Sequence, residues 1–514
     1  IKWIPIAYFI VELSGVIIAI ACAVYIYMKY VVFNYWSSEN IESVKAAVPF
    51  GSLWPVLSSE LSIGEFVRDT YLEFKKRPLC GFYSFYKPTL VINDPDLIRI
   101  VLTKEFAHFH DRGMYCNEKI DPLTGHLFLL PGAKWRYLRT KFSPTFTSSK
   151  MKQMFFTVKE CSDVLSAHTI NIVIMYFRFF TSFDYRFSTD IIASTAFGIK
   201  CNSIENPDAE FRKWGRKFFE PRPINNVVTA LMPQLLDLFN IPSIDKDVSN
   251  FFINAFKETV EYRTANNVVR KDFMNLIIEL MNKGYIQDND GKQSAHVSEI
   301  DTERITMLEG AAQAFVFWLA GFETSSSTAT HCLYELALHQ DVQNKVADEI
   351  NRVLAESGGI TYESLKQMHY LHKVVSETLR KYPSVPLLNR QCTEEFELPG
   401  TGFRVAKGTP ILIPVWGLQS DPDIYPNPDE FDPERFSEEN IAGRHQYTYL
   451  PFGEGPRNCI GMRFGLVQTK VGLLSLLSKY RFTPGPDLKV PLPLDKGNFV
   501  VCPIGGITLR VERR

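Results

Sequence analysis

Hydrophobic residues form a continuous run near the N-terminus, from Ile4 to Met28, in which Glu12 is the only charged residue. A helix that spans a membrane needs about 20 predominantly apolar residues. No convincing small-residue cleavage site follows the run, which favours a retained signal anchor over a removed signal peptide. A buried core helix is the alternative, but a terminal and unbroken apolar run is more typical of an anchor. We therefore expect a membrane anchor over residues 1–30 and a hinge over residues 31–55.

From residue 56 onward, apolar residues mainly follow helical spacing, and strand-like runs are the minority. The pattern predicts long helices over residues 307–339, 341–357 and 370–383, short strands over residues 87–94 and 409–417, and a hairpin around Gly505 and Gly506 over residues 498–513. The apolar run over residues 169–180 is too short to span a membrane, so a core helix is expected there. No linker divides this region. The prediction is a mainly α fold with a small β subdomain, in one large domain over residues 56–514.

Charge and cysteine content exclude several classes of protein. Lys and Arg total 56 against 57 Asp and Glu, and a chain so balanced is not a general nucleic-acid binder. The nine cysteines are scattered, odd in number and without a CxxC pair, which argues against a disulfide framework or a zinc ribbon. GxGxxG, GxxxxGK[ST], GxSxG and HExxH motifs are absent from the sequence. Redox chemistry in this protein would therefore take its electrons from another protein.

One cysteine stands out, in the stretch "PFGEGPRNCIG" from Pro451 to Gly461. Gly453 and Gly455 permit positive φ angles and the close approach of a flat ligand. A helical pattern follows Cys459, and a helix N-terminus is expected to lower the pKa of a thiol. A single thiolate without histidine neighbours suits zinc or an iron–sulfur cluster poorly, whereas haem iron needs one axial protein ligand. An inert buried cysteine is the alternative, but it would not need so many glycines.

The same stretch resembles the haem-binding signature of the cytochrome P450 family, F-x-x-G-x-[R/H]-x-C-x-G. Phe452, Gly455, Arg457, Cys459 and Gly461 fill every position of that signature. The resemblance implies the cytochrome P450 fold and a haem b cofactor. It also implies that Cys459 is the axial ligand of the haem iron and that the other four residues contribute to haem binding.

A second motif, Glu377-Thr378-Leu379-Arg380, matches the ExxR sequence of the family. Residues three apart share a helix face, so Glu377 and Arg380 can pair, although such pairs usually decorate a solvated surface. Arg435, in "FDPERF", matches the third member of a buried Glu-Arg-Arg network in the family. The resemblance implies a structural role for the three residues, which hold the segment that leads to the cysteine loop.

A third motif, "AGFET" from Ala320 to Thr324, lies within the longest predicted helix. Hydroxyl side chains there can compete for the carbonyl oxygens one turn earlier and weaken the helix locally. An ordinary buried helix with a few hydroxyls is the alternative. The resemblance implies that Thr324 donates a hydrogen bond to dioxygen and that Glu323 belongs to the proton path.

Four further residues are candidates for contact with the haem propionates. Trp135 and Arg139 match the WxxxR motif of the family, and Arg390 and Arg457 are similar candidates. Arginine suits this role because its planar guanidinium pairs well with carboxylates, although an ordinary surface arginine is the alternative for each.

The stretches "FHDRG", "DPLTGHLF" and "AQAFVFWLAGFETSS" resemble the microsomal insect branch of the family. That resemblance implies a monooxygenase that oxidises hydrophobic small molecules, either xenobiotics such as plant toxins and insecticides or endogenous lipids and hormones. It implies electrons from NADPH through NADPH-cytochrome P450 reductase, with cytochrome b5 as a further candidate partner, and a catalytic domain on the cytosolic face of the endoplasmic reticulum membrane. A reductase-independent isomerase or dehydratase and a non-catalytic haem-binding sensor are the alternatives. The intact Glu323-Thr324 pair argues against the first.

Two surfaces are predicted with less support from motifs. A basic patch for an acidic reductase is expected from Lys134, Arg136, Lys141 and Arg463, although a solvated helix face explains each of them singly. The substrate pocket is expected to include apolar side chains from several segments, although the 39 phenylalanines of the chain also serve as core residues. The pocket candidates are Phe109, Phe128, Phe315, Leu387, Leu388 and Phe499.

Overall fold

The computed structural model describes residues 4–175, 179–180, 182–220, 222, 228–229, 232–286 and 303–514. The helices are α1 (Ile4–Tyr30), α2 (Tyr35–Ser38), α3 (Trp54–Leu57), α4 (Ile63–Phe74), α5 (Pro95–Arg99), α6 (Gly132–Phe142), α7 (Ser148–Met175), α8 (Ser182–Ile192), α9 (Glu210–Phe219), α11 (Pro233–Phe239), α12 (Lys246–Ala265), α13 (Phe273–Lys283), α14 (Met307–Leu338), α15 (Gln340–Ser357), α16 (Tyr362–Gln367), α17 (His369–Lys381), α18 (Val415–Gln419), α19 (Glu438–Ala442) and α20 (Met462–Leu477). The strands are β1 (Leu79–Ser84), β2 (Lys87–Ile92), β3 (Phe179–Phe180), β4 (Leu388–Gln391), β5 (Phe396–Glu397), β6 (Arg404–Val405), β7 (Pro410–Ile413), β8 (Tyr480–Pro484) and β9 (Thr508–Arg513).

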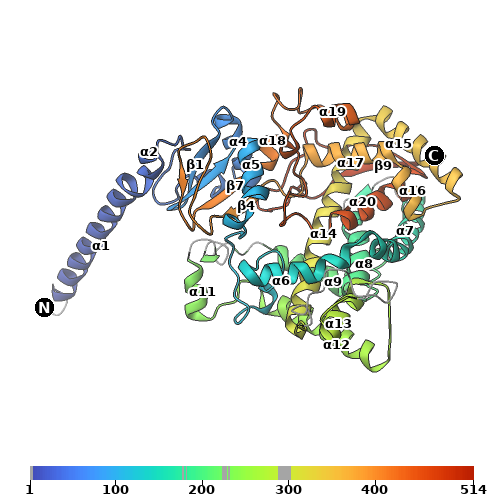
Figure 1. The fold of residues 1–514 in the computed structure, drawn as a ribbon, viewed down its shortest axis with the longest axis horizontal. Coiled ribbons are helices and arrows are strands. Elements are labelled where there is room, and N and C mark those ends of the chain that lie inside the picture. Colours follow the sequence, from blue (N-terminus) through green and yellow to red (C-terminus); the bar gives the residue numbers. More distant parts are fainter. Residues whose placement is uncertain are drawn as a thin grey trace.

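Helix α1 projects away from the rest of the molecule (Figure 1). Among the described residues, one helical segment, Glu12–Ser38, is long and apolar enough to cross a membrane, and its apolar part is not buried. Side chains such as Ile18 and Ile20 are exposed along it. An exposed apolar helix argues against the alternative of a core helix, because burial is what a core helix would need.

Helix α14 is the central element of the helical region and passes through it from one side to the other (Figure 1). A capping box starts the helix, in which the Thr306 hydroxyl accepts from the Glu309 N–H and the Glu309 carboxylate accepts from the Thr306 N–H. Helices α8, α12, α13, α17 and α20 pack against α14, so most of its residues are buried. Functional side chains on α14 are therefore held by contacts on several sides.

A small four-stranded sheet lies between α1 and the helical region, with the order β1-β2-β7-β4 (Figure 1). Strand β2 pairs antiparallel with β1 and parallel with β7, and β4 pairs antiparallel with β7, with Arg390 opposite Ile411. Asp111 forms an isolated bridge with Gln391 at the end of β4. The sheet thus brings the segment around residue 111 beside strand β4.

The structure confirms most of the predicted elements. Helices α14, α15 and α17 match the three predicted long helices, and β2 matches the first predicted strand. The second predicted strand is shorter than expected, because β7 ends at Ile413 and residues 415–419 form α18. In the apolar run over residues 169–180, α7 extends to Met175 and residues 179–180 form β3, while residues 176–178 lie outside the described residues.

The predicted C-terminal hairpin around Gly505 and Gly506 is wrong. Strand β9 pairs antiparallel with β8, with Thr483 opposite Arg510, and residues 498–502 form a loop. Local turn signals gave no indication of this partner, because β8 lies more than twenty residues earlier in the chain. The loop over residues 495–502, which we name the C-terminal loop, instead lies against α14, where the Ser327 hydroxyl donates to the Val501 carbonyl.

Candidate active site

The cysteine loop depends on glycine at position 455. Gly453 and Gly455 have φ angles of +67° and +76°, as the sequence predicted. A Cβ added to Gly455 would lie 1.9 Å from the Leu102 carbonyl oxygen, so no larger residue fits without a backbone shift. The Cys459 N–H donates to the Phe452 carbonyl at 2.8 Å and closes the loop. The loop therefore holds Cys459 in one fixed position.

Helix α20 begins directly after this loop, as predicted, and the structure shows that Gly461 is its N-cap. The Cys459 side chain is accessible, yet protein surrounds it, which is the combination expected of a residue that lines an internal cavity. Burial raises the pKa of the thiol and outweighs the Gly461 N–H and the charges of Arg139 and Arg112, which act to lower it. The predicted lowering of this pKa is therefore wrong for the thiol alone. A metal ion would still remove the proton, because a coordinating thiol is deprotonated.

Helix α14 presents a short accessible stretch in its otherwise buried middle. Ala320 is exposed and Thr324 is half-buried, one turn apart on the same face. The Thr324 hydroxyl donates to the Ala320 carbonyl at 2.7 Å, and the Ser326 and Thr328 hydroxyls make the same contact one turn back. The predicted competition for carbonyl oxygens is confirmed. The Gln468 side chain, from α20, also donates to the Gly321 carbonyl at 3.2 Å.

Glu323 is a buried carboxyl without a cationic partner among the described residues. Its side chain contacts the C-terminal loop, where the Asn498 amide donates to Glu323 Oε1 at 3.1 Å. Burial raises the pKa of Glu323 to about 7, and the nearby charge of Asp495 acts in the same direction. This carboxyl can therefore hold or release a proton near neutral pH.

Four arginines gather near Cys459: Arg112, Arg139, Arg390 and Arg457. Burial and mutual repulsion lower the pKa of Arg112 to about 10 and of Arg457 to about 9, and hold the pKa of Arg390 well below its usual range. Asp111, with Oδ1 3.5 Å from Arg457 Nη2, is the carboxylate that faces this arginine cluster in the described part of the chain. The cluster thus carries excess positive charge in a buried place.

Several guanidinium nitrogens of the arginine cluster have no partner within the described residues. They are Nε of Arg112, Arg390 and Arg457, together with Nη1 of Arg457. Unpaired buried donors are costly unless a ligand accepts their hydrogen bonds. A flat ligand with two carboxylates beside a thiolate-bound metal would satisfy these donors, and haem has this combination of groups. The donor set therefore fits haem: the arginines would hold its propionates, and Cys459 would bind its iron.

Helix α6 positions two of the predicted haem contacts. Trp135 is buried, and the Arg457 guanidinium lies 4.1 Å from the centre of its ring. Arg139 donates through Nη1 and Nη2 to the backbone and side-chain oxygens of Asn458, at 2.9 and 2.7 Å. The structure therefore brings Trp135, Arg139, Arg390 and Arg457 together, as the sequence predicted. Arg112 was missed, although its stretch, "FHDRG", had been singled out.

The Glu377 network is buried, and Glu377 and Arg380 are well paired within it. Arg380 Nε and Nη2 donate to the two Glu377 carboxylate oxygens at 2.7 and 2.9 Å. Arg435 Nε lies 3.4 Å from Glu377 Oε1, and further Arg380 hydrogens go to the Gln419 and Pro428 carbonyls. The network therefore joins α17 to the segment that precedes the cysteine loop, which is the arrangement predicted for it.

Comparison with known proteins bears on this site. The family model described as Cytochrome P450 matches residues 48–511. Cytochrome P450 6k1 of Blattella germanica is 40% identical over 495 residues, which are 94% of this chain and 94% of that protein. Cytochrome P450 6a2 of Drosophila melanogaster is 40% identical over 495 residues, 94% of this chain and 96% of that protein. Cytochrome P450 6A1 of Musca domestica is 40% identical over 496 residues, 93% of this chain and 94% of that protein.

The chain belongs to the cytochrome P450 family. It is a monooxygenase oxidoreductase with the mainly helical fold of that family. Membership implies a haem cofactor, a redox partner, a hydrophobic substrate and dioxygen. The signature around Cys459 and the near-complete coverage of insect relatives thus agree with the resemblance found from the sequence.

The six predicted pocket residues of this cytochrome P450 do not form one group. Phe109 is 0% exposed and packs edge-to-face on Phe396, with ring centres 5.5 Å apart, in the core beside the sheet. Leu388 belongs to the same core, and Leu387 belongs to a separate small core. The expectation that Phe109 lines a shared pocket is not supported, because the ring is fully enclosed by core contacts.

The other three candidates lie in different surroundings. Phe315 is fully buried in the helical core and packs against Phe252, with ring centres 5.1 Å apart. Phe128 lies under the Arg112 guanidinium, 4.3 Å from its ring centre, so it is adjacent to the arginine cluster. Phe499 is 43% exposed on the C-terminal loop. Phe128 and Phe499 therefore remain the candidates with free surface for a ligand.

The predicted basic patch is also wrong in two of its four members. Lys134 pairs with Glu118 at 2.6 Å and with Glu309 at 2.9 Å. Lys141 is buried, and its ammonium donates to the Gly284 carbonyl at 2.6 Å. A cluster of basic residues in the sequence does not reveal ion pairs and hydrogen bonds to distant segments. Arg136 and Arg463 remain exposed.

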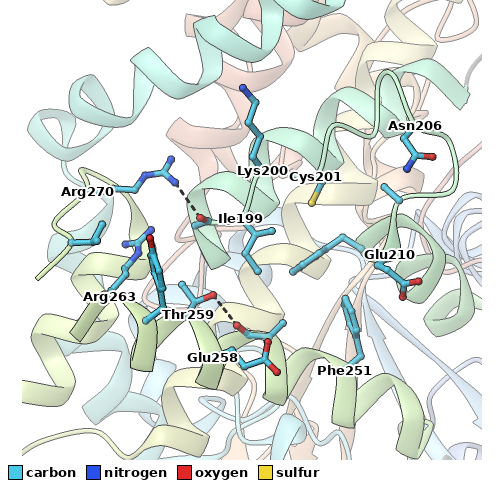
Figure 2. A pocket seen from close by; sticks show the side chains of 16 residues that line it. Ile199, Lys200, Cys201, Asn206, Glu210, Phe251, Glu258, Thr259, Arg263 and Arg270 are labelled. Carbon is cyan, nitrogen blue, oxygen red and sulfur yellow. Dashed lines mark hydrogen bonds between the residues drawn. The ribbon is translucent and has the colours of Figure 1, made fainter. Parts of the chain in front are cut away.

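A separate cleft of about 700 Å³ opens between α9, α12 and residues 198–201 (Figure 2). A buried ion pair forms part of its wall, in which Arg263 Nη1 and Nη2 donate to the two Asp272 oxygens at 2.8 and 2.7 Å. None of the predicted site residues lines this cleft. The size of this cleft alone therefore gives no reason to assign it a role in the reaction with dioxygen.

Proposed function

We propose that this cytochrome P450 inserts one atom of dioxygen into hydrophobic small molecules with electrons from NADPH, delivered by NADPH-cytochrome P450 reductase. Xenobiotics such as plant toxins and insecticides are the proposed substrate class, with endogenous lipids or hormones as the alternative. The observation that carries the proposal is the accessible thiol of Cys459 beside a buried cluster of arginines with unpaired donors. The substrate class rests on the resemblance of the chain to the insect branch of the family, and insect relatives cover nearly its full length.

In this proposal, the residues around Cys459 bind and orient the cofactor. Haem bound through Cys459 supplies the activation of dioxygen. The propionates would be held by Trp135, Arg139, Arg390 and Arg457, and we add Arg112 to this set because its guanidinium lies in the same cluster. Phe452 and Gly461 border the thiolate, and Gly455 keeps the loop closed. The Glu377, Arg380 and Arg435 side chains keep the preceding segment in place.

The catalytic residues in this proposal are Thr324 and Glu323. Thr324 presents its hydroxyl oxygen on the accessible stretch of α14 and can exchange its hydrogen bond with Ala320 for one to dioxygen. Glu323 holds a proton near neutral pH because its carboxyl is buried. The exclusion of water and the orientation of substrate fall to the surrounding apolar side chains.

We place the protein at the endoplasmic reticulum membrane. Residues 1–30 form the proposed anchor, residues 31–55 the hinge and residues 56–514 the catalytic domain on the cytosolic side. The exposed apolar surface of α1 supports this placement, because such a surface is unfavourable in water.

The direct test uses the full chain in membranes with NADPH-cytochrome P450 reductase, with and without cytochrome b5, and isotopically labelled dioxygen. We expect one labelled oxygen atom in the product from a panel of apolar plant toxins and insecticides, and no product without the reductase. Product formed from a peroxide without reductase would favour an isomerase or dehydratase. Binding of haem with no substrate-dependent consumption of NADPH would favour a sensor.

A further inference from the structure

The C-terminal loop meets α14 beside Thr324, and the contact is made through a side chain that no family motif singled out. We propose that Asn498 is a positioning residue: its amide holds the Glu323 carboxyl toward the C-terminal loop and thereby controls proton delivery beside Thr324. This inference rests on the proposed monooxygenase function.

The hydrogen bonds of Asn498 define the direction of its amide. Its Oδ1 accepts from the Val500 N–H at 3.0 Å, and its Nδ2 donates to Glu323 Oε1 at 3.1 Å. Because the oxygen is already used within the loop, the amino group is the one that faces the carboxyl. The same amide also contacts the Cys502 thiol. Asn498 therefore links the loop, the carboxyl and a buried cysteine.

Further hydrogen bonds hold the C-terminal loop against the same part of α14. The Ser327 hydroxyl donates to the Val501 carbonyl, and the Val501 N–H donates to the Ser384 carbonyl at 3.2 Å. The Ser384 hydroxyl in turn donates to the Thr324 carbonyl at 3.2 Å. The position of Asn498 is thus tied to the backbone of the residue that carries the catalytic hydroxyl.

The electrostatic surroundings make the pKa of Glu323 sensitive to the Asn498 amide. Among the described residues, Asp495 of the C-terminal loop is the titratable group whose charge acts on the pKa of Glu323, and no lysine or arginine does so. The Glu323 charge in turn raises the pKa of the nearby Cys502 thiol. The Asn498 hydrogen bond is the contact that stabilises the carboxylate and opposes the effect of burial on the pKa of Glu323. Removing that donor should make the proton harder to release.

The experiment compares Asn498→Asp, Asn498→Ala and Glu323→Gln in the holoenzyme. Asn498→Asp keeps an oxygen that can accept from the Val500 N–H, so the turn survives, but it replaces the donor with a carboxylate. Asn440→Ala is the matched control, because it removes an exposed asparagine amide whose Nδ2 donates to the Glu434 carbonyl. Two quantities are measured across pH: the infrared band of the protonated Glu323 carboxyl, assigned by its loss in Glu323→Gln, and the product formed per NADPH consumed.

We expect the midpoint of the infrared titration to rise by about one pH unit in Asn498→Asp and by less in Asn498→Ala. Product per NADPH at neutral pH should fall by roughly two- to tenfold in Asn498→Asp, and Asn440→Ala should match the wild type. A wild-type midpoint and wild-type coupling in Asn498→Asp would overturn the proposal and leave Asn498 with a purely structural role. A shifted midpoint with unchanged coupling would also overturn it. If the midpoint shifts in Asn498→Asp but the wild-type protein itself forms no product, the monooxygenase function is refuted. Asn498 would then still be the residue that controls the pKa of Glu323.

Discussion

Two groups of buried arginines in this cytochrome P450 differ in how their charges are compensated. In the Glu377 network, Arg380 meets a carboxylate with two hydrogen bonds and gives its remaining hydrogens to backbone carbonyls. In the arginine cluster around Arg390 and Arg457, donors remain unpaired and the guanidinium groups repel one another. The first group has its carboxylate within the protein, and its one buried donor without a hydrogen bond among the described residues, Arg435 Nε, still lies 3.4 Å from Glu377 Oε1. The second has the electrostatic character of a binding site for an anionic ligand.

The comparison teaches that burial of arginine alone does not reveal its role. A paired buried charge holds the fold together, and its loss leaves an uncompensated partner behind. An unpaired buried charge costs stability and is retained where a ligand compensates for it. The balance of donors and acceptors therefore separates structural from cofactor-binding arginines in this protein.

The largest effect is expected from Glu377→Ala. This change leaves Arg380 and Arg435 buried without their carboxylate, so the free energy of unfolding should fall by about 3–5 kcal/mol. Urea unfolding followed by circular dichroism measures it. Glu363→Ala is the control, because Glu363 pairs with Lys152 and Lys366 on the surface and its removal should cause no measurable change. Equal stability of the two variants would contradict a structural role for the Glu377 network.

A smaller effect is expected from Glu323, a buried carboxyl without a cationic partner in the described part of the chain. Its pKa of about 7 in the folded protein lies above the ordinary value, so the folded state binds the proton more tightly than the unfolded chain does. Its stabilising contribution is fully present below about pH 4.5 and is lost as pH rises through about 7. Relative to Glu323→Gln, wild-type protein should lose about 3 kcal/mol across that range, as measured by urea unfolding at a series of pH values. Parallel pH dependences in the two proteins would show that Glu323 has an ordinary pKa.

The arginine cluster should respond in the opposite way to the Glu377 network. In Arg390→Leu, the free energy of unfolding of haem-free protein should stay the same or rise, because repulsion with Arg112 and Arg457 is relieved. Haem affinity should fall by about 10- to 100-fold through loss of a charge-assisted hydrogen bond, and the preference for haem over its dimethyl ester should shrink. Haem titration measures both. A large loss of stability without a change in haem affinity would place Arg390 in a structural role. The control is Arg404→Leu, an exposed arginine on strand β6.

The smallest effect is expected at Arg139, which already has protein partners. Its two hydrogen bonds to Asn458 hold the residue before Cys459, and lysine can replace only one of them. Arg139→Lys should lower haem affinity by about three- to tenfold, with little change in the free energy of unfolding. A loss as large as that of Arg390→Leu would mean that Arg139 contributes to the propionate site as fully as Arg390 does.

Much of the site could be predicted because its determinants are local or belong to a specific motif. The glycines around Cys459, the spacing of Glu377 and Arg380, and the hydroxyls after Ala320 act within a few residues of each other. The position of a helix start after Cys459 likewise follows from the helical pattern that succeeds it. Local sequence patterns therefore suffice to predict these features without any tertiary contact.

The missed features depend on contacts between distant segments. Arg112 joins the arginine cluster because residue 111 bridges to strand β4, and Asn498 reaches Glu323 because the C-terminal loop lies against α14. Burial decides the pKa of the Cys459 thiol against the local effect of the helix. Strand pairing between β8 and β9 and the ion pairs of Lys134 likewise depend on the assembled fold.

The central claim is that Cys459 binds haem iron as a thiolate. The most direct test is the carbon monoxide difference spectrum of the dithionite-reduced holoprotein, compared with Cys459→Ala and with Cys392→Ala as a control for the loss of a buried thiol. We predict a strongly red-shifted Soret band in the wild type and in Cys392→Ala, and its absence in Cys459→Ala. A red-shifted band that persists in Cys459→Ala, or its absence in folded wild-type protein supplied with haem, would contradict the claim.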